Sequence, residues 1–558
     1  YGVSTAYAAK IYRQYQKDAI KTVKENPYKL ADDIWGIGFK TADGIASKMG
    51  YENNDPRRCR SGILYTLNQL AEEGHVFAEP EQLVTAAKEL LQADDEPVRK
   101  VMAEMIAAND LIADNEVVYL PPFYHAENGS AKRLTALLAS NISDSIAAEP
   151  ELAYGAQQST GIVYDEVQQA AINQALDSKV MVLTGGPGTG KTTTTQGIIA
   201  AFKAKGKQIV LAAPTGRAAK RMTEATGMEA KTIHRLLEYN PMDGYKRNDE
   251  NPLEGDVLIV DECSMIDIML FYNLMKAIPE TMRLILVGDI DQLPSVGAGN
   301  VLRDIIDSRQ IPVVRLTRIF RQAQSSRIVM NAHAINAGQF PNISNGRNTD
   351  FFFIKAEDAE TIPQLIVSLV RDRLSKTYGY KPKEIQVLTP MQRGNVGAGN
   401  LNTELQSALN PSEPALTRGG YTFRQGDKVM QIRNNYDKNV FNGDIGYVNA
   451  VDTTERTLTV IYDGRLVEYD VSELDELTLA YAVTIHKSQG SEFPVVVMPV
   501  TMKHFVMLQR NLIYTGITRA KKICVLVGTT KALAYAIKQN TVSKRNTKLK
   551  ERLNDNCL

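Results

Sequence analysis

Short apolar runs alternate with helical stretches between about residues 162 and 340. Five of these runs are rich in Val, Ile and Leu, and they lie at 180–184, 209–213, 257–260, 284–287 and 312–316. Strands that are apolar throughout are typical of a parallel sheet covered on both faces. A second set of runs follows at 385–389, 495–500 and 523–528. The pattern therefore predicts two α/β units of similar build.

The pattern changes between the strands of the second unit. Residues 418–475 contain short strands separated by Gly and Asn turns, among them Asp427–Ile432, Gly446–Val448 and Thr457–Val460. Short strands with frequent turns are typical of a small barrel. We expect a β-barrel inserted into the second α/β unit.

The chain on either side of these units has a different character. Residues 1–50 read as helices punctuated by glycine, and residues 55–125 as short amphipathic helices that end in the apolar run Glu116–Leu120. The second stretch predicts a small winged-helix-like module, and polar residues 155–161 predict a linker. The basic tail after residue 540 predicts a solvated, mobile terminus. Because the chain begins at Tyr1 inside a motif, we expect it to be part of a longer protein.

Composition narrows the class of protein only a little. A chain of 558 residues is too long for one core and predicts about three or four domains. Lys plus Arg and Asp plus Glu both number 64, so net charge neither favours nor excludes nucleic acid. The four cysteines form no CxxC pair, which disfavours disulfides or zinc and predicts a reducing, cytoplasmic location. No apolar run reaches the roughly 18 residues of a membrane span, so no membrane partner is expected.

A glycine-rich loop supplies the first chemistry. Residues 185–192 read Gly-Gly-Pro-Gly-Thr-Gly-Lys-Thr directly after the apolar run 180–183. Backbone N–H groups of such a loop converge on a phosphate at a helix N-terminus. Lys191 suits the β- and γ-phosphates, and the Thr192 hydroxyl suits Mg²⁺. The expected ATP contacts are Gly185, Gly186, Pro187, Gly188, Thr189, Gly190, Lys191, Thr192 and Thr193.

Two further strands end in polar residues. The run 257–260 leads into Asp261 and Glu262, which are placed to hold Mg²⁺ and to polarise the attacking water, respectively. An acidic helix cap is the alternative interpretation of this pair. The run 284–287 leads into Gly288 and Asp289, and Gln292 follows as a candidate sensor of the γ-phosphate. Because parallel strands end at one edge, all three segments are expected to meet there.

A larger set of motifs gives a family resemblance. The segments Ala213–Ala219, Thr232–Leu237 and Gly288–Pro294 resemble consecutive motifs of superfamily 1 helicases of the RecD/TraA type. Ile319–Gln322, Ala482–Glu492 and Tyr514–Ala520 are similar to the fourth, fifth and sixth motifs of that family. The resemblance runs from about residue 160 to 530, in order and with no motif missing.

The resemblance implies an α/β fold with two RecA-like parallel-sheet motor domains and an SH3-like β-barrel inserted in the second. It also implies a helix–hairpin–helix extension before an all-helical or winged-helix-like region. The expected ranges are 1–52 for the helix–hairpin–helix region, 53–150 for the winged-helix-like module and linker, 151–340 for the first motor domain, and 341–558 for the second with its insertion at about 415–478.

The family pattern also assigns roles within the nucleotide site. It assigns Gln168 to the adenine, and Arg321 and Arg519 to the γ-phosphate from the second motor domain. A guanidinium that stabilises the transferring phosphoryl group is worth on the order of 10³–10⁵ in rate. The alternative for either arginine is a surface ion pair, worth about 0–1 kcal/mol. The implied catalytic set is Lys191, Asp261, Glu262, Gln292, Arg321 and Arg519, with Thr192 and Asp261 at the metal.

The same resemblance implies a face for single-stranded DNA. Its expected members are Pro214, Thr215, Gly216, Arg217, Thr232, His234, Gln392, Arg393, Asn402, Thr484 and His486. Phe320, Tyr436 and Phe441 are candidate groups for base stacking, although aromatic residues more often belong to the core.

Two segments are candidate duplex-handling elements. The polar stretch 239–256 lies where the family carries a β-hairpin pin that splits the duplex, and an ordinary long loop is the alternative. Residues 34–43 resemble a helix–hairpin–helix, whose backbone N–H groups receive DNA phosphates without reading sequence. Tyr1–Ser4 resembles the end of a second copy. Such hairpins also serve as packing modules, and Trp35 is expected in the core.

The leading hypothesis is an ATP-dependent, Mg²⁺-using DNA helicase that steps 5′→3′ on single-stranded DNA and unwinds forked or 5′-tailed duplex. Its direction comes from the resemblance alone. A monomeric motor with a role in DNA repair or recombination is expected. The alternatives are a helicase directed at RNA, which the 2′-OH would distinguish, and an ATP-gated DNA clamp that does not unwind.

Overall fold

The structure is a computed structural model that describes residues 5–34, 36–140, 161–346, 349–411, 413–435, 437–540 and 544–556. Four sequence-based expectations fall outside these residues: those for Tyr1–Ser4, Trp35, Tyr436 and most of the linker at 155–161. Within the described ranges, no helix is both long enough and apolar enough to span a bilayer.

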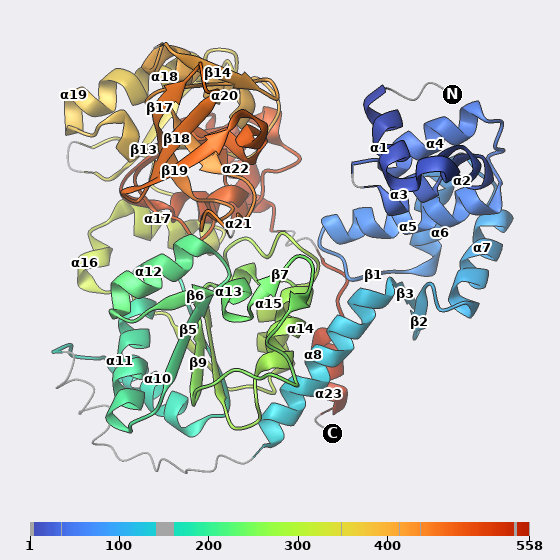
Figure 1. The fold of residues 1–558 in the computed structure, drawn as a ribbon. Coiled ribbons are helices and arrows are strands. Elements are labelled where there is room, and N and C mark those ends of the chain that lie inside the picture. Colours follow the sequence, from blue (N-terminus) through green and yellow to red (C-terminus); the bar gives the residue numbers. More distant parts are fainter. Residues whose placement is uncertain are drawn as a thin grey trace.

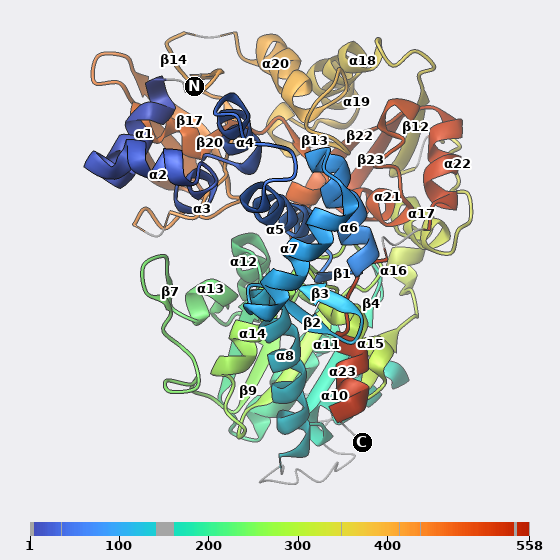
Figure 2. The same cartoon turned by 90° about the vertical axis from the view of Figure 1, so that its right-hand side faces the viewer.

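The N-terminal region is helical and stands to one side of the molecule (Figure 1). It contains α1 (Thr5–Tyr15), α2 (Ala19–Glu25), α3 (Lys29–Asp33), α4 (Phe39–Lys48), α5 (Pro56–Glu72), α6 (Pro80–Leu91) and α7 (Asp95–Ala107). A small antiparallel sheet in the order β1-β3-β2 follows, made of Phe77–Ala78, Val117–Tyr119 and Ile112–Asp114. The long helix α8 (Pro121–Ala139) then descends along the first α/β unit and packs on α14 (Figures 1 and 2).

The first α/β unit, called here the first motor half, is built on a six-stranded parallel sheet. Its strand order is β11-β4-β10-β9-β5-β6. The strands are β4 (Val180–Gly185), β5 (Ile209–Ala213), β6 (Ala230–Thr232), β9 (Val257–Val260), β10 (Arg283–Gly288) and β11 (Val313–Leu316). The helices are α10 (Glu166–Asp177), α11 (Lys191–Ala204), α12 (Gly216–Thr226), α13 (Ile233–Leu236), α14 (Ile268–Ala277) and α15 (Val301–Ser308).

The second motor half carries a five-stranded parallel sheet in the order β12-β23-β22-β13-β21. Its strands are β12 (Phe351–Lys355), β13 (Ile385–Thr389), β21 (Ala482–Thr484), β22 (Phe493–Val500) and β23 (Ala520–Gly528). Its helices are α16 (Arg321–Gln324), α17 (Arg327–Asn336), α18 (Ile362–Ser368), α19 (Leu374–Tyr378), α20 (Ala398–Leu409), α21 (Arg510–Ile517) and α22 (Thr530–Lys538). The two sheets confirm the predicted pair of RecA-like halves.

The inserted β-structure is also present. A five-stranded antiparallel sheet runs β19-β18-β17-β16-β20, beside the hairpin of β14 (Ala415–Arg418) and β15 (Tyr421–Arg424). Its strands are β16 (Lys428–Gln431), β17 (Ile445–Asp452), β18 (Thr457–Tyr462), β19 (Arg465–Asp470) and β20 (Leu477–Leu479). Alternate side chains of β18 are buried, as expected for a strand with one face on a core. The exact boundaries that the sequence predicts between the modules stay predictions.

The prediction of a solvated, mobile tail is wrong for residues 544–556, called here the C-terminal strap. The strap ends in helix α23 (Leu549–Asn556), which packs on α8 and α15 (Figure 2). Leu549 and Leu553 are fully buried in the core of the first motor half. Asn546 bonds the N-terminal region, where its carbonyl accepts from the N–H of Val76 at 2.8 Å. Three of the basic residues that indicated a solvated end, Arg545, Lys548 and Arg552, instead donate to carbonyl or acidic groups of the first motor half and the N-terminal region.

Candidate nucleotide site and nucleic-acid interface

The phosphate loop joins β4 to α11 and is shaped by glycine. Gly188 and Gly190 have φ of +72° and +84°, a region that disfavours other residues. A methyl group added at Gly190 would lie 2.6 Å from Gln168 Nε2, so the loop has no room for a side chain there. The ammonium group of Lys191 donates to the carbonyl oxygen of Gly185, inside the loop. A bound phosphate would offer this cation a stronger acceptor in the same place.

The two predicted carboxylates follow β9 at the same edge of the sheet as the loop. Burial and the neighbouring Glu262 raise the pKa of Asp261 to about 6, while Lys191 and Arg221 act in the opposite direction. Glu262 has a φ of +53°, a strained conformation for a non-glycine residue. Asp261, Glu262 and Thr192 line one cleft, which suits a cation shared with a substrate phosphate. No group of three or more His, Cys, Asp or Glu side chains that could hold a metal ion by itself occurs in the described ranges.

The segment after β10 connects this edge to the second motor half. Asp289 is buried and accepts a hydrogen bond of 2.8 Å from the hydroxyl of Tyr514 on α21. Gln292 donates to Asp289 at 3.3 Å and lines the nucleotide cleft. The Leu293 N–H donates to Thr515 Oγ1, and the Leu293 carbonyl accepts from Gln489 Nε2, both at 2.9 Å. The segment predicted to sense the γ-phosphate therefore bonds directly to the fifth and sixth motifs.

The residue that the family resemblance assigns to the adenine lies at the start of α10. Gln168 is 2% exposed and forms a capping box with Asp165, which fixes its side chain. Its Nε2 atom is buried, has no hydrogen-bond partner and approaches Gly190. Phe320 also lies against Gly190, since a methyl group there would be 2.9 Å from its ring. Phe320 therefore lies beside the phosphate loop, and its candidate role in stacking on DNA bases stays a prediction.

The second motor half completes the cleft from the opposite side. The cleft encloses about 650 Å³, and Arg519 lines it together with Lys191. Arg519 is 2% exposed, and its guanidinium donates to the Thr515 and Ser491 carbonyls and to Thr518 Oγ1. These partners carry no charge, so the cation is available to an anion in the cleft. Arg321 begins α16, and its side chain lies outside what the structure describes.

An ionic network around the cleft was not anticipated from sequence. Arg221 on α12 forms an ion pair with Glu492 of the second motor half at 2.5 Å and lies 3.7 Å from Glu262. Glu492 also pairs with Lys521 at 3.2 Å. His333 on α17 lies 2.9 Å from the Pro187 carbonyl of the phosphate loop. Arg217 lies in the motif Ala213–Ala219, and Arg221 follows it by one turn of α12. This spacing places both side chains on the same face of the helix, and it is the feature of the sequence from which Arg221 could have been predicted.

The predicted nucleic-acid residues of the first motor half lie at the start of α12 and around α13. Thr215 caps α12 by accepting from the Ala218 N–H, and Gly216 lies near the ring of Phe441 in the inserted barrel. Arg217 donates to Ser491 Oγ at 2.9 Å and lies over the Phe493 ring, and burial lowers its pKa. Arg217 therefore bridges the two halves.

Thr232 and His234 are adjacent to the predicted pin. Thr232 caps α13 by accepting from the Arg235 N–H at 3.1 Å. The segment forms a short hairpin of β7 (Tyr239–Asn240) and β8 (Gly244–Tyr245). The Tyr239 and Tyr245 rings pack at 4.8 Å, and the His234 ring lies 5.6 Å and 6.0 Å from them. The base of the hairpin is thus fixed to a predicted DNA-binding residue.

The second motor half contains the remaining predicted nucleic-acid-binding residues, which differ in their exposure. Gln392 and Arg393 are exposed in the loop after β13. Thr484 ends β21, and burial together with Arg545 lowers the pKa of His486. Asn402 is 3% exposed and clamps the backbone of Ala482 through both its amide oxygen and its amide nitrogen, each at 2.8 Å. Asn402 positions β21 and does not face a groove, which corrects its predicted role.

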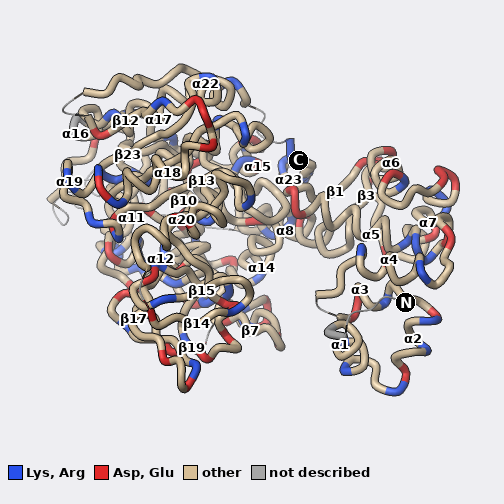
Figure 3. Tube along the Cα trace, turned by 90° about the horizontal axis from the view of Figure 1, so that it is seen from above, with Lys and Arg blue, Asp and Glu red and all other residues tan. Residues whose placement is uncertain are grey.

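Basic residues on the described trace are interspersed with acidic ones and do not gather on one face in the view of Figure 3. Binding of a nucleic-acid strand must therefore depend on the local groups described above rather than on a broad positive surface.

Two RecA-like halves that share one nucleotide cleft, with the ordered motifs along it, define a superfamily 1 helicase. Four family models match: an ATP-dependent RecD2 DNA helicase HHH domain at 1–77, an AAA domain at 168–298, an ATP-dependent RecD-like DNA helicase SH3 domain at 401–462, and a UvrD-like helicase C-terminal domain at 479–527. The ATP-dependent RecD2 DNA helicase of Deinococcus radiodurans is 34% identical over 99% of this chain and 76% of its own length. The chain belongs to this family of ATP-dependent RecD2 DNA helicases.

Other similar proteins are more distant. The RecBCD enzyme subunit RecD of Mycobacterium tuberculosis is 31% identical over 77% of this chain and 79% of its own length. Among solved structures, a Pif1 helicase from Bacteroides in complex with ADP-AlF3 and single-stranded DNA aligns with a TM-score of 0.42 and 20% identity, over 66% of this chain and 94% of that chain.

Proposed function

We propose that the chain steps 5′→3′ along single-stranded DNA and unwinds forked or 5′-tailed duplex, using ATP and Mg²⁺. The observation that carries this proposal is the shared cleft, in which Lys191 of the first motor half faces Arg519 of the second. A nucleotide bound between two halves changes their separation when its charge changes, and this couples hydrolysis to movement.

Each residue of the cleft has a role in this proposal. Lys191 neutralises the β- and γ-phosphates, and Thr192 with Asp261 would hold the cation, which supplies further neutralisation of the phosphates when bound. Glu262 orients and polarises the attacking water. Gln292 contacts the γ-phosphate and reports its loss, and Arg519 stabilises the charge that develops on the transferred group.

Movement is passed to the strand through contacts between the halves. Arg217 bonds Ser491 at 2.9 Å, and both residues lie in segments predicted to face DNA. The Leu293 bonds to Thr515 and Gln489 connect the γ-phosphate sensor to the same region. Closure and opening of the cleft therefore shift one set of strand contacts relative to the other, which is the elementary event of stepping.

The hairpin at 239–245 is proposed as the element that separates the duplex. Its exposed tip includes Met242, which is 93% exposed, while its base is fixed by Tyr239, Tyr245 and His234. Opening one base-pair step of DNA costs about 1.4 kcal/mol, and a rigid obstacle in front of a stepping motor supplies that work. The motor is proposed to act as a monomer, since one chain provides both sides of the cleft. Its proposed compartment is the cytoplasm, because Cys59, Cys263 and Cys524 are buried free thiols.

A strand-displacement assay with matched duplexes tests the proposal. Duplex with a 5′ tail should be unwound and duplex with a 3′ tail should not. Lys191→Ala should abolish unwinding while DNA binding persists.

Replacement of residues 240–244 by a two-residue turn should retain DNA-stimulated ATP hydrolysis and remove unwinding. Unwinding from the 3′ tail would refute the direction, and full unwinding without the hairpin tip would refute the pin. Equal activity on an RNA-tailed duplex would favour the RNA-directed alternative, and hydrolysis without any displacement would favour the clamp.

A further inference from the structure

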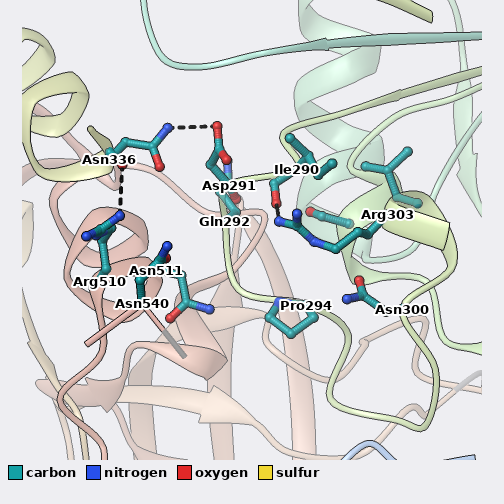
Figure 4. Close-up of a pocket in the computed structure, with 12 residues that line it drawn as sticks. Ile290, Asp291, Gln292, Pro294, Asn300, Arg303, Asn336, Arg510, Asn511 and Asn540 are labelled. Atoms are coloured by element: carbon teal, nitrogen blue, oxygen red, sulfur yellow. Dashed lines mark hydrogen bonds between the residues drawn. The ribbon is translucent and has the colours of Figure 1, made fainter. Parts of the chain in front are cut away.

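A second cavity lies beside Gln292. It encloses about 190 Å³, and its walls come from both motor halves (Figure 4). The first half contributes residues that flank Gln292, together with Asn300 and Arg303, and the second contributes Arg510 and Asn511. At about 30 Å³ per water molecule this space holds roughly six waters, so a tetrahedral oxyanion fits. Gln292 lines both this cavity and the nucleotide cleft.

The charges on the cavity wall favour an anion. Arg303 donates to the Ile290 carbonyl at 3.0 Å, and Arg510 donates to the Asn336 carbonyl at 3.5 Å (Figure 4). Arg510 also donates to the Ile537 carbonyl at 2.9 Å. Within the described ranges, neither guanidinium forms an ion pair with a carboxylate. Asp291 is the carboxylate on the wall, and it accepts from the amide of Asn336 at 2.8 Å. Two unpaired cations and one engaged carboxylate leave the cavity with net positive charge.

Three residues of this wall carry a buried polar atom that has no hydrogen-bond partner in the part of the chain that the structure describes. Ser264 and Gln292 are 9% and 8% exposed, and the Ser264 hydroxyl and the Gln292 amide oxygen have no hydrogen-bond partner. The amide oxygen of Asn511 is in the same condition. A buried polar atom without a partner costs about 1–3 kcal/mol, so these positions fit a polar occupant.

The position of the cavity indicates which anion reaches it. Ser264 follows Glu262 by two residues, and Glu262 lines the nucleotide cleft. Gln292 stands between the two spaces and is the residue expected at the γ-phosphate. We propose that the cavity is a transit site for inorganic phosphate, which leaves the nucleotide cleft past Gln292 and Ser264 while ADP stays in place. The proposal rests on the proposed function, since it takes ATP hydrolysis as the source of the phosphate.

The wall charges explain why the site would pass phosphate on rather than retain it. Arg303 and Arg510 draw the anion out of the cleft, whereas Asp291 weakens its hold by repulsion. Departure by this route does not require the two halves to separate. Phosphate release can then precede opening of the cleft and escape of ADP.

Two variants test the site without touching the catalytic residues. Arg303→Gln removes one cation, and Asn300→Asp adds a negative charge at the residue before α15, where an acidic cap is tolerated. Arg315→Gln is the matched control, since Arg315 is an exposed arginine on β11 outside the cavity. In a single turnover, ATP cleavage is followed by chemical quench and phosphate release by a fluorescent phosphate-binding protein. Both cavity variants should slow release by about tenfold, with cleavage unchanged, because each weakens a charged hydrogen-bonded site.

A binding measurement separates this proposal from the proposed function. With ADP and aluminium fluoride filling the nucleotide cleft, the ³¹P line of added inorganic phosphate should broaden for the native chain and for Arg315→Gln, and not for Arg303→Gln or Asn300→Asp. Equal broadening in all four proteins, no broadening in the native chain, or unchanged release in both cavity variants would each overturn the transit site. None of these results bears on whether the native chain unwinds DNA.

Discussion

A buried ion pair between Glu127 and Arg552 contributes to the docking of the C-terminal strap. Glu127 on α8 is fully buried, and burial raises the pKa of its carboxyl group. It accepts from Tyr119 Oη at 3.0 Å, from the Lys548 N–H at 2.7 Å and from Arg552 Nε at 3.4 Å. Arg552 also pairs with Asp114 at 2.6 Å, and its side chain is 13% exposed. Arg552→Met keeps most of the apolar stem and removes the guanidinium.

The magnitude of this change follows from what Glu127 can do without its partner. Removal of one member of a buried pair costs about 3–5 kcal/mol. The carboxylate can instead take up a proton, which from the ordinary glutamate pKa of 4.5 costs about 3.4 kcal/mol at pH 7, at about 1.36 kcal/mol per unit. Protonation therefore limits the loss, and we expect the docked strap to be destabilised by about 3 kcal/mol, a factor of roughly one hundred in its undocking equilibrium.

Hydrogen exchange of α23 measures this equilibrium directly. An isolated helix as short as α23 is not stable in water, so its amides are protected only while it is docked. Arg552→Met should speed their exchange roughly a hundredfold, and the double variant with Glu127→Gln should recover most of the protection. Arg99→Met on α7 is the matched control, since Arg99 pairs with Glu81 and Asp95 away from the strap and should leave α23 unchanged. Unchanged exchange in Arg552→Met, or further loss in the double variant, would refute the reasoning.

Three further predictions concern the cleft, pH and Asn402. Arg519→Ala should lower DNA-stimulated ATP turnover, measured in steady-state assays, by on the order of 10³-fold or more. Nucleotide affinity, measured by stopped-flow binding, should change little. Equal losses of turnover and affinity would contradict the role of Arg519. Burial raises the pKa of Asp304 to about 7, so the folded state binds the extra proton between the ordinary aspartate value of 3.8 and about 7. The stability of the native chain should therefore fall as pH rises through that window. The urea midpoint of Asp304→Asn should exceed that of the native chain by an amount that grows across the window and then levels off. A difference between the two midpoints that does not depend on pH would contradict this. Asn402→Ala should destabilise the second motor half by about 2 kcal/mol, because both Ala482 backbone groups lose their partner. The affinity for single-stranded DNA, measured by fluorescence anisotropy, should stay the same. A loss of affinity without a loss of stability would restore the predicted DNA contact.

The sequence predicted the central strands of both sheets because they are buried on both faces. Strand β22 is apolar along its whole length, and β4 is apolar from Val180 to Leu183, because both faces of these strands are buried. The missed strands β6, β12 and β21 all lie at an edge of their sheet, and β6 and β21 have only three residues each, which is too short to show a period. The phosphate loop and the acidic pair after β9 were found because their chemistry is contiguous in the chain.

Contacts between distant segments account for what was not predicted. The strap carries many basic residues and only two leucines that reach the core, so its composition indicates a solvated end. The acidic partners of Arg552 are Glu127 and Asp114, each more than four hundred residues earlier, and no local pattern connects them. Asn402 has the polar character of a binding residue, but whether its amide faces a groove or clamps β21 is decided by packing. Sequence identified which groups are chemically competent, and the fold decided which of them are already satisfied.

The segment from Asp289 to Gly299 joins the functions of the molecule in one stretch of backbone. Its first part contacts the nucleotide cleft through Gln292 and bonds the second motor half through Leu293. Its last part is held by Arg545 of the strap, which donates to the Gly299 and Gly297 carbonyls at 2.6 Å and 3.0 Å. The Gly299 N–H in turn donates to the Gly74 carbonyl of the N-terminal region at 2.9 Å. A shift of Gln292, the predicted sensor of the γ-phosphate, would act on a segment tied at its other end to the strap and the N-terminal region. Because packed interfaces adopt discrete arrangements rather than deforming continuously, we expect such a segment to transmit a change of nucleotide state to both.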